Sequence, residues 1–94
     1  MTPEEEIRRA GKAKEILDSE LFKEAVSATE EALKHGRLQS AATAHDLREK
    51  LWAQELALFT IVNHLRTHIE TGELAAETIR RKGLAERIKD VFQQ

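Results

Sequence analysis

Two histidines four residues apart, His64 and His68, form the first pattern in this sequence that could do chemistry. On a helix this spacing places both imidazoles on one face, as in the histidine pair of a zinc-binding helix. A zinc protease would also need a glutamate directly after the first histidine, where this chain has Leu65, and a structural zinc site would need two further ligands. His35 and His45 have no such spacing. We therefore predict no metal site and expect a hydrogen-bonding helix face, with a pH-sensitive contact as the open alternative.

A second candidate lies near the C-terminus, where the stretch "IRRKGLAERIK" holds five basic residues against one acidic residue, with Asp90 directly after it. The basic residues are Arg80, Arg81, Lys82, Arg87 and Lys89. Such side chains neutralise phosphates without reading sequence, so the segment is a candidate nucleic-acid contact. A solvated helix face is the simpler interpretation, because no aromatic residue is interleaved for single-strand stacking and no helix-turn-helix with a basic recognition helix is present.

Catalytic patterns are weaker still. Ser19, Ser27 and Ser40 have no nucleophile elbow or triad around them, and the acidic residues recur at helical spacing, which is typical of a charged surface. The absence of cysteine excludes a thiolate metal site, a cysteine nucleophile and a disulfide framework. We expect no enzymatic activity and no cofactor.

Composition indicates an all-helical protein. Of the 94 residues, 34% are charged, 40% hydrophobic and only 4% aromatic, with four glycines and one proline. A net charge of −2 gives no overall attraction to nucleic acid or to an anionic membrane. The longest run without a charged residue, 56–65, is far shorter than the ~20 residues that span a bilayer. The N-terminus lacks the apolar region of a signal peptide, so we expect a soluble, cytoplasmic protein without membrane contact.

The helices that must position these residues can be placed from their end signals. Residues 2–5 (TPEE) open a helix with a capping threonine, a proline at the first position and acidic residues. Asp18 and Ser19 mark either the start of a second helix or a kink in one long helix. We expect Gly36 to end this segment and Gly72 to end a further helix over 44–71.

These elements predict an all-α fold, an elongated antiparallel helical hairpin with a C-terminal helical extension. The hairpin domain is expected over residues 1–72 and the amphipathic extension over 73–94, with a hinge or break at Gly83. A two-helix hairpin covers only part of a wide apolar face, so we expect a homo-oligomer and a protein partner for the C-terminal helix.

The apolar pattern of the third helix supports that expectation. Its main stripe follows alternating steps of four and three residues with a gap at Glu55, and comprises Leu47, Leu51, Leu58, Val62, Leu65 and Ile69. Further apolar side chains flank it, so this region is either ordinary core or core plus an oligomer interface. The predicted oligomer or partner interface comprises Trp52, Leu56, Phe59, Ile61, Leu84, Ile88 and Phe92.

Three stretches within residues 13–76 also resemble a group of small helical proteins encoded by tailed bacteriophages and prophages near head and packaging genes. They are 17–25 (LDSELFKEA), 48–52 (REKLW) and 68–75 (HIETGELA). The resemblance implies virion assembly or DNA packaging as the setting, in the host cytoplasm or the virion, and transfers no functional residue. We expect a non-enzymatic interaction or assembly protein; the alternative is a nucleic-acid-binding accessory such as a small DNA-packaging subunit.

Overall fold

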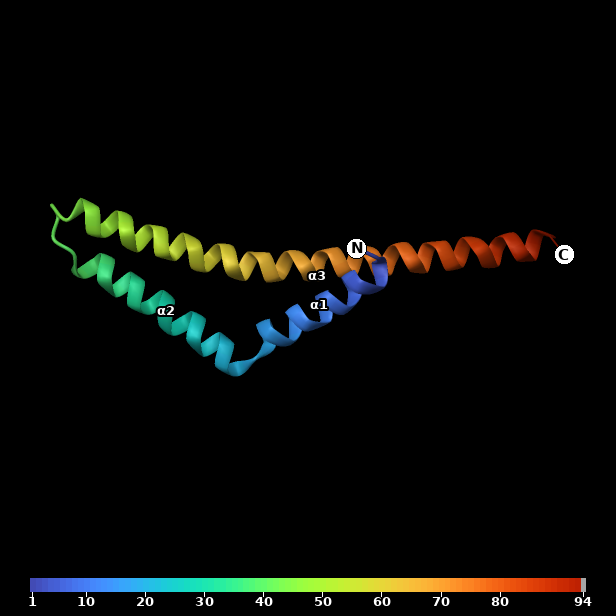
Figure 1. Ribbon diagram of the computed structural model, residues 1–94, viewed down its shortest axis with the longest axis horizontal. Helices are drawn as coiled ribbons and strands as arrows, with labels where there is room; N and C mark the ends of the chain where they lie inside the picture. The colour runs from blue at the N-terminus through green and yellow to red at the C-terminus, as the bar shows by residue number, and fades with distance from the viewer. Residues whose placement is uncertain (94) are drawn as a thin grey trace. The chain divides into compact units, whose positions relative to one another are not determined.

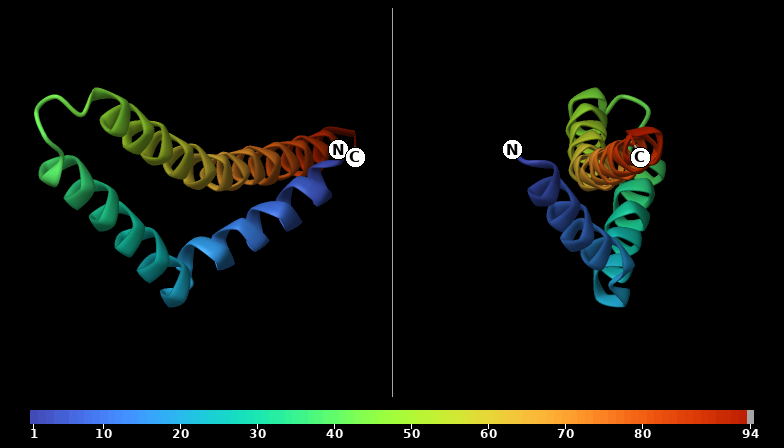
Figure 2. Two further views of the ribbon diagram at one scale, coloured as in Figure 1. Left: turned by 60° about the vertical axis from the view of Figure 1, so that its left-hand side comes forward. Right: turned by 90° about the vertical axis from the view of Figure 1, so that its right-hand side faces the viewer.

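The computed structural model describes residues 1–93, and this part of the chain consists of three helices without a strand. They are α1 (Pro3–Asp18), α2 (Glu20–Gln39) and α3 (His45–Gln93), shown in blue, blue-green and green-to-red in Figure 1. The predicted all-α fold is therefore confirmed. The short connection between α2 and α3 reverses the chain direction, which makes these two helices a hairpin (Figure 2).

Two hydroxyl caps set the boundaries of α1 and α2. The Oγ1 of Thr2 accepts a hydrogen bond from the backbone N–H of Glu5 at 3.2 Å, at the start of α1. Ser19 has extended backbone angles, φ −63° and ψ 125°, and its Oγ accepts from the N–H of Phe22 at 3.3 Å. This N-cap satisfies a donor that a new helix leaves without a partner. Of the two alternatives, separate helices rather than one kinked helix are therefore observed.

Three glycines do not interrupt the helices that contain them. The predictions that Gly36 and Gly72 end helices, and that a helix is interrupted at Gly83, are wrong. Helix α2 continues to Gln39, and α3 runs without interruption through Gly72 and Gly83. None of the glycines has a positive φ. A glycine inside a helix costs only about 1 kcal/mol relative to alanine, which strong helix formers on either side outweigh. The expected boundary between residues 1–72 and 73–94 thus lies inside a continuous helix.

The chain divides into two compact units, each of which we describe by itself. The hairpin unit is Glu15–His64, and the terminal unit is Met1–Lys14 together with α3 from Leu65 onward. In the hairpin unit, Leu33 of α2 is buried, and the half-buried positions of α3 follow steps of four and three residues. These positions are Leu51, Glu55, Leu58 and Val62. The steps match the seam of a coiled coil, in which each apolar side chain packs between residues of the facing helix.

The terminal unit is held together by small residues. Ala13 of α1 and Gly72 and Ala75 of α3 are buried, and Ala10 is half-buried. A Cβ atom added at Gly72 would overlap the Cβ of Ala10 and would lie 3.1 Å from the carbonyl oxygen of Glu6. The backbones of α1 and α3 therefore approach each other closely at Gly72, and the glycine is needed for that approach rather than for a helix end.

Candidate interaction surface

An exposed aromatic row lies on the hairpin unit. It comprises Trp52, Leu56 and Phe59, whose exposed fractions are 62%, 50% and 61%. Their spacing of four and three residues places them on one face of α3, rotated by about 100° from the positions that pack against α2. The helix that covers the seam therefore leaves this row uncovered. The predicted interface residues Trp52, Leu56 and Phe59 are thus brought together on one exposed face.

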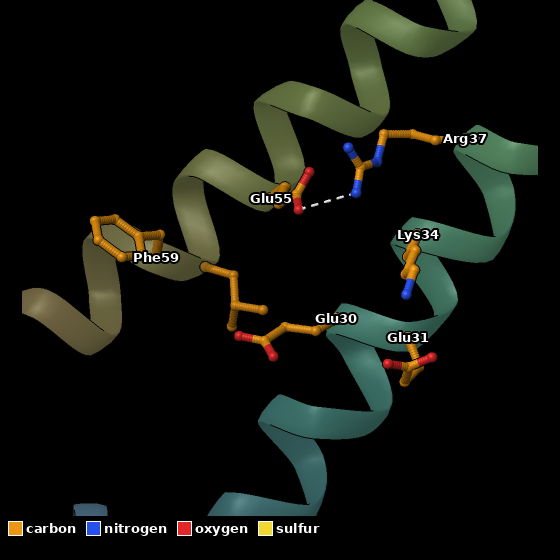
Figure 3. Close-up of a pocket in the computed structure, with 7 residues that line it drawn as sticks. Glu30, Glu31, Lys34, Arg37, Glu55 and Phe59 are labelled. Atoms are coloured by element: carbon orange, nitrogen blue, oxygen red, sulfur yellow. Dashed lines mark hydrogen bonds and ion pairs between the residues drawn. The ribbon is translucent and has the colours of Figure 1, made fainter.

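A shallow groove of about 280 Å³ runs beside this row, between α2 and α3 (Figure 3). It is lined by Glu30, Glu31, Lys34, Arg37, Glu55, Leu58 and Phe59. Across it, Nη2 of Arg37 donates to Oε1 of Glu55 at 3.2 Å. The pair explains the predicted gap in the apolar stripe at Glu55, because a carboxylate at this seam position is matched by an arginine of the facing helix. Such a partly exposed pair contributes only ~0.2–1 kcal/mol, so its main effect is on the alignment of α2 with α3.

Ile61 does not belong to the aromatic row. It is 58% exposed, but two residues after Phe59 it points roughly 200° away around the helix. It therefore lies on the other side of the packed seam, where Ala53 and Ala57 precede it at four-residue steps. The structure thus separates the predicted interface of the hairpin unit into two faces, and only the aromatic row presents large side chains together.

The second uncovered surface is the last part of α3. Every residue from 78 to 92 is exposed. We call the four apolar side chains Leu84, Ile88, Val91 and Phe92 the terminal stripe; their exposed fractions are 55%, 49%, 70% and 84%. At about 100° per residue they share one side of the helix. The predicted interface residues Leu84, Ile88 and Phe92 are therefore adjacent. Val91 was not in the predicted interface, although its three-residue spacing from Ile88 places it in the same apolar pattern.

The basic residues of this segment are divided around the helix. Arg80 Nη2 and Arg81 Nε lie 2.6 and 3.0 Å from Glu77 Oε1. The hydrogen bond from Arg80 is the main reason that the pKa of Glu77 lies below its usual value, with Arg81 adding to the effect. Helical geometry places Arg80 and Arg87 on one side of the terminal stripe, Arg81 on the face of the stripe, and Lys82 and Lys89 near the opposite face. The five predicted contacts therefore do not form one continuous patch.

The histidine pair does not extend to a ligand set in the described residues. Within residues 1–93, no group of three or more His, Cys, Asp or Glu side chains is placed to hold a metal ion. His68 is half-buried and His64 is exposed, and both make interactions within the protein. Over the same residues, no helix has the length and the apolar character needed to cross a membrane.

Comparison with known proteins identifies no relative of this chain. Neither the family models, nor the curated proteins, nor the solved structures match this chain. The functional conclusion therefore rests on the physical features of the aromatic row and the terminal stripe.

Proposed function

We propose that this chain is a non-enzymatic helical interaction protein that acts as an assembly or adaptor component. The observation that supports this proposal is the large number of apolar side chains that no other part of the described chain buries. Among residues 1–93, the buried hydrophobic residues are only Ala13, Leu33 and Ala75, and no large side chain is fully buried. Burial of apolar side chains is the main favourable term in folding and association, so the uncovered residues are the natural contacts for partners.

The size of the exposed surface supports the same proposal. The chain exposes 7780 Å², whereas folded monomers of 10.7 kDa expose about 5,500 Å². The surplus is roughly 2,300 Å², and a standard protein interface removes about 800 Å² from each partner. The surplus is therefore large enough for two interfaces of ordinary size, one for each uncovered surface.

For the aromatic row, the proposed occupant is a second copy of the chain. Two helices form one layer, and a second hairpin unit placed on it would complete a four-helix bundle. A twofold interface brings the same surface together twice, so it must be complementary to itself. The groove beside Phe59 meets this condition, because it carries both acidic residues, Glu30 and Glu31, and basic residues, Lys34 and Arg37.

The biological setting that we propose is virion assembly of a tailed bacteriophage, in the host cytoplasm or in the virion. Its support is the sequence resemblance of residues 17–25, 48–52 and 68–75. The terminal stripe would dock another protein of the assembly in this setting.

Self-association is tested by light scattering over a range of protein concentrations. We expect a dimer that dissociates on dilution, and we expect the double variant Leu56→Glu, Phe59→Glu to raise the dissociation constant at least about 100-fold, because it buries charges at the centre of the interface. The matched control is Leu21→Glu, which changes a 76% exposed leucine of α2 outside the row. Circular dichroism checks that each variant is helical.

Two outcomes would contradict this part of the proposal. A strictly monomeric wild-type protein at every concentration would exclude the second copy as the occupant. Equal association of the wild type and the double variant would place the interface elsewhere.

The alternative function is nucleic-acid binding, favoured by the exposed basic residues of the last segment. It predicts a gel shift with DNA or RNA that weakens steeply as salt is raised, because bound cations are released from the phosphates. The triple variant Arg80→Ala, Arg81→Ala, Lys82→Ala should lose most of that shift, and Lys12→Ala, which changes a lysine of α1, serves as the control. An absent shift at low salt removes this alternative.

A further inference from the structure

The last part of α3 has the spacing of apolar residues that is typical of a helix in a coiled coil. Leu84, Ile88 and Val91 follow steps of four and three residues and are 49–70% exposed. The same steps occur upstream in α3, where Leu51, Glu55 and their successors pack against another helix. Because an apolar seam repeated every 3.5 residues is the contact surface of one helix with another, this segment is shaped to receive a further helix.

Within residues 78–92, the charged side chains nearest to the terminal stripe are basic. Arg80 and Arg87 lie directly beside the stripe on one side, and Arg81, seven residues before Ile88, lies on the face of the stripe itself. Lys82 and Lys89 lie farther round the helix, beyond Ala85 and Phe92, next to the opposite face that holds Glu86 and Asp90. An apolar centre with a basic flank is complementary to an apolar centre with an acidic flank. Residues that flank a helical seam select the partner by charge.

We propose that the terminal stripe binds an acidic amphipathic helix of another protein, an inference that rests on the proposed role as an interaction protein. A second copy of the same segment fits poorly: in a parallel pair Arg81 would meet Arg81 on the seam, and in an antiparallel pair the Arg80 and Arg87 sides of the two copies would face each other. Nucleic acid would contact the basic flanks but leave Leu84, Ile88 and Val91 exposed to water.

The probe is a fluorescent synthetic peptide of about 21 residues, three heptads, with Ile and Leu at the seam positions and Glu at the flanking positions. Glutamates on both flanks keep the peptide from pairing with itself, so binding to the full-length protein is read directly by fluorescence anisotropy. The matched probe has the same seam with Lys at the flanking positions. We expect the acidic peptide to bind at least about tenfold more tightly than the basic peptide, and the difference to shrink in high salt.

Two variants locate the contact on the chain. Leu84→Asp, Ile88→Asp should weaken binding of the acidic peptide at least about tenfold, because it introduces acidic charges into the apolar centre. Arg80→Glu, Arg87→Glu should abolish the preference for the acidic peptide over the basic one. The control Leu56→Glu, Phe59→Glu changes the aromatic row and should leave peptide binding unchanged.

The remaining outcomes separate this inference from the proposed function. Equal binding of both peptides, or no binding, would overturn the acidic-helix partner, while dimerisation through the aromatic row would still stand by light scattering. Loss of dimerisation in Leu84→Asp, Ile88→Asp would make a second copy the occupant and would also overturn the inference. Tight binding to vesicles of phosphatidylcholine and phosphatidylserine that depends on Leu84 and Ile88 would instead assign the stripe to a membrane surface.

Discussion

Replacing Gly72 by alanine is expected to destabilise the protein, although alanine is the better helix former. The added Cβ would overlap the Cβ of Ala10 and crowd the carbonyl oxygen of Glu6 at 3.1 Å. Neither atom is the end of a flexible side chain, so α1 must move away from α3. Such overpacking costs about 1–3 kcal/mol. Urea unfolding followed by circular dichroism measures the loss, and hydrogen exchange should show faster exchange of the α1 amides.

Two other glycines of the chain provide matched controls with the opposite sign. Gly83 lies in the same helix and Gly11 lies in α1, and an added Cβ meets nothing within 4 Å at either position. Alanine at these positions should stabilise the protein by about 0.5–1 kcal/mol, because it lowers the conformational freedom of the unfolded chain and favours the helix. Stabilisation of Gly72→Ala by a similar amount would contradict the close approach at Gly72.

A compensating substitution tests the contact itself. In the Gly72→Ala background, Ala10→Gly removes the clashing Cβ from the other helix. The double variant should be more stable than the sum of the two single changes predicts, because the two sites share one contact. Strict additivity of the two free-energy changes would show that the residues do not meet.

Replacing Leu33 by alanine should have the largest effect in the hairpin unit. Leu33 is 8% exposed, and among residues 1–93 it is the only large hydrophobic side chain that is buried. Truncation of a buried leucine to alanine removes transfer free energy and leaves a cavity, at a cost of about 2–4 kcal/mol. Small domains have total stabilities of about 5–15 kcal/mol, so this loss is large. The midpoint of urea unfolding should fall accordingly.

The same chemical change on an exposed side of α2 is the control. Leu38 is 74% exposed, so Leu38→Ala should change the free energy of unfolding by no more than about 0.5 kcal/mol. Both substitutions introduce the same residue into the same helix, and only the burial of the leucine differs. Equal effects of Leu33→Ala and Leu38→Ala would show that Leu33 does not pack against α3.

Local interactions made much of the fold predictable. The caps at Thr2 and Ser19 bond to N–H groups only three residues away, so their signals are contained in a few consecutive residues. The face formed by Leu51, Leu58 and Val62 follows from helical periodicity alone. The candidate surfaces were also predictable as sets of residues, because the apolar spacing of the aromatic row and of the terminal stripe is visible in the sequence.

The sequence by itself determined the helical class, the starts of the first and third helices and the apolar faces, because each depends on neighbours within about one or two turns. The tertiary structure decided the rest. A glycine can either end a helix or allow two helices to approach closely, and the sequence does not distinguish these two roles for Gly72. The contact with Ala10 on the facing helix shows that Gly72 has the second role. The gap in the apolar stripe at Glu55 is explained by the ion pair with Arg37, which lies eighteen residues away in the sequence. Which apolar faces stay exposed likewise depended on which face the neighbouring helix covers, and that is a property of packing between distant segments.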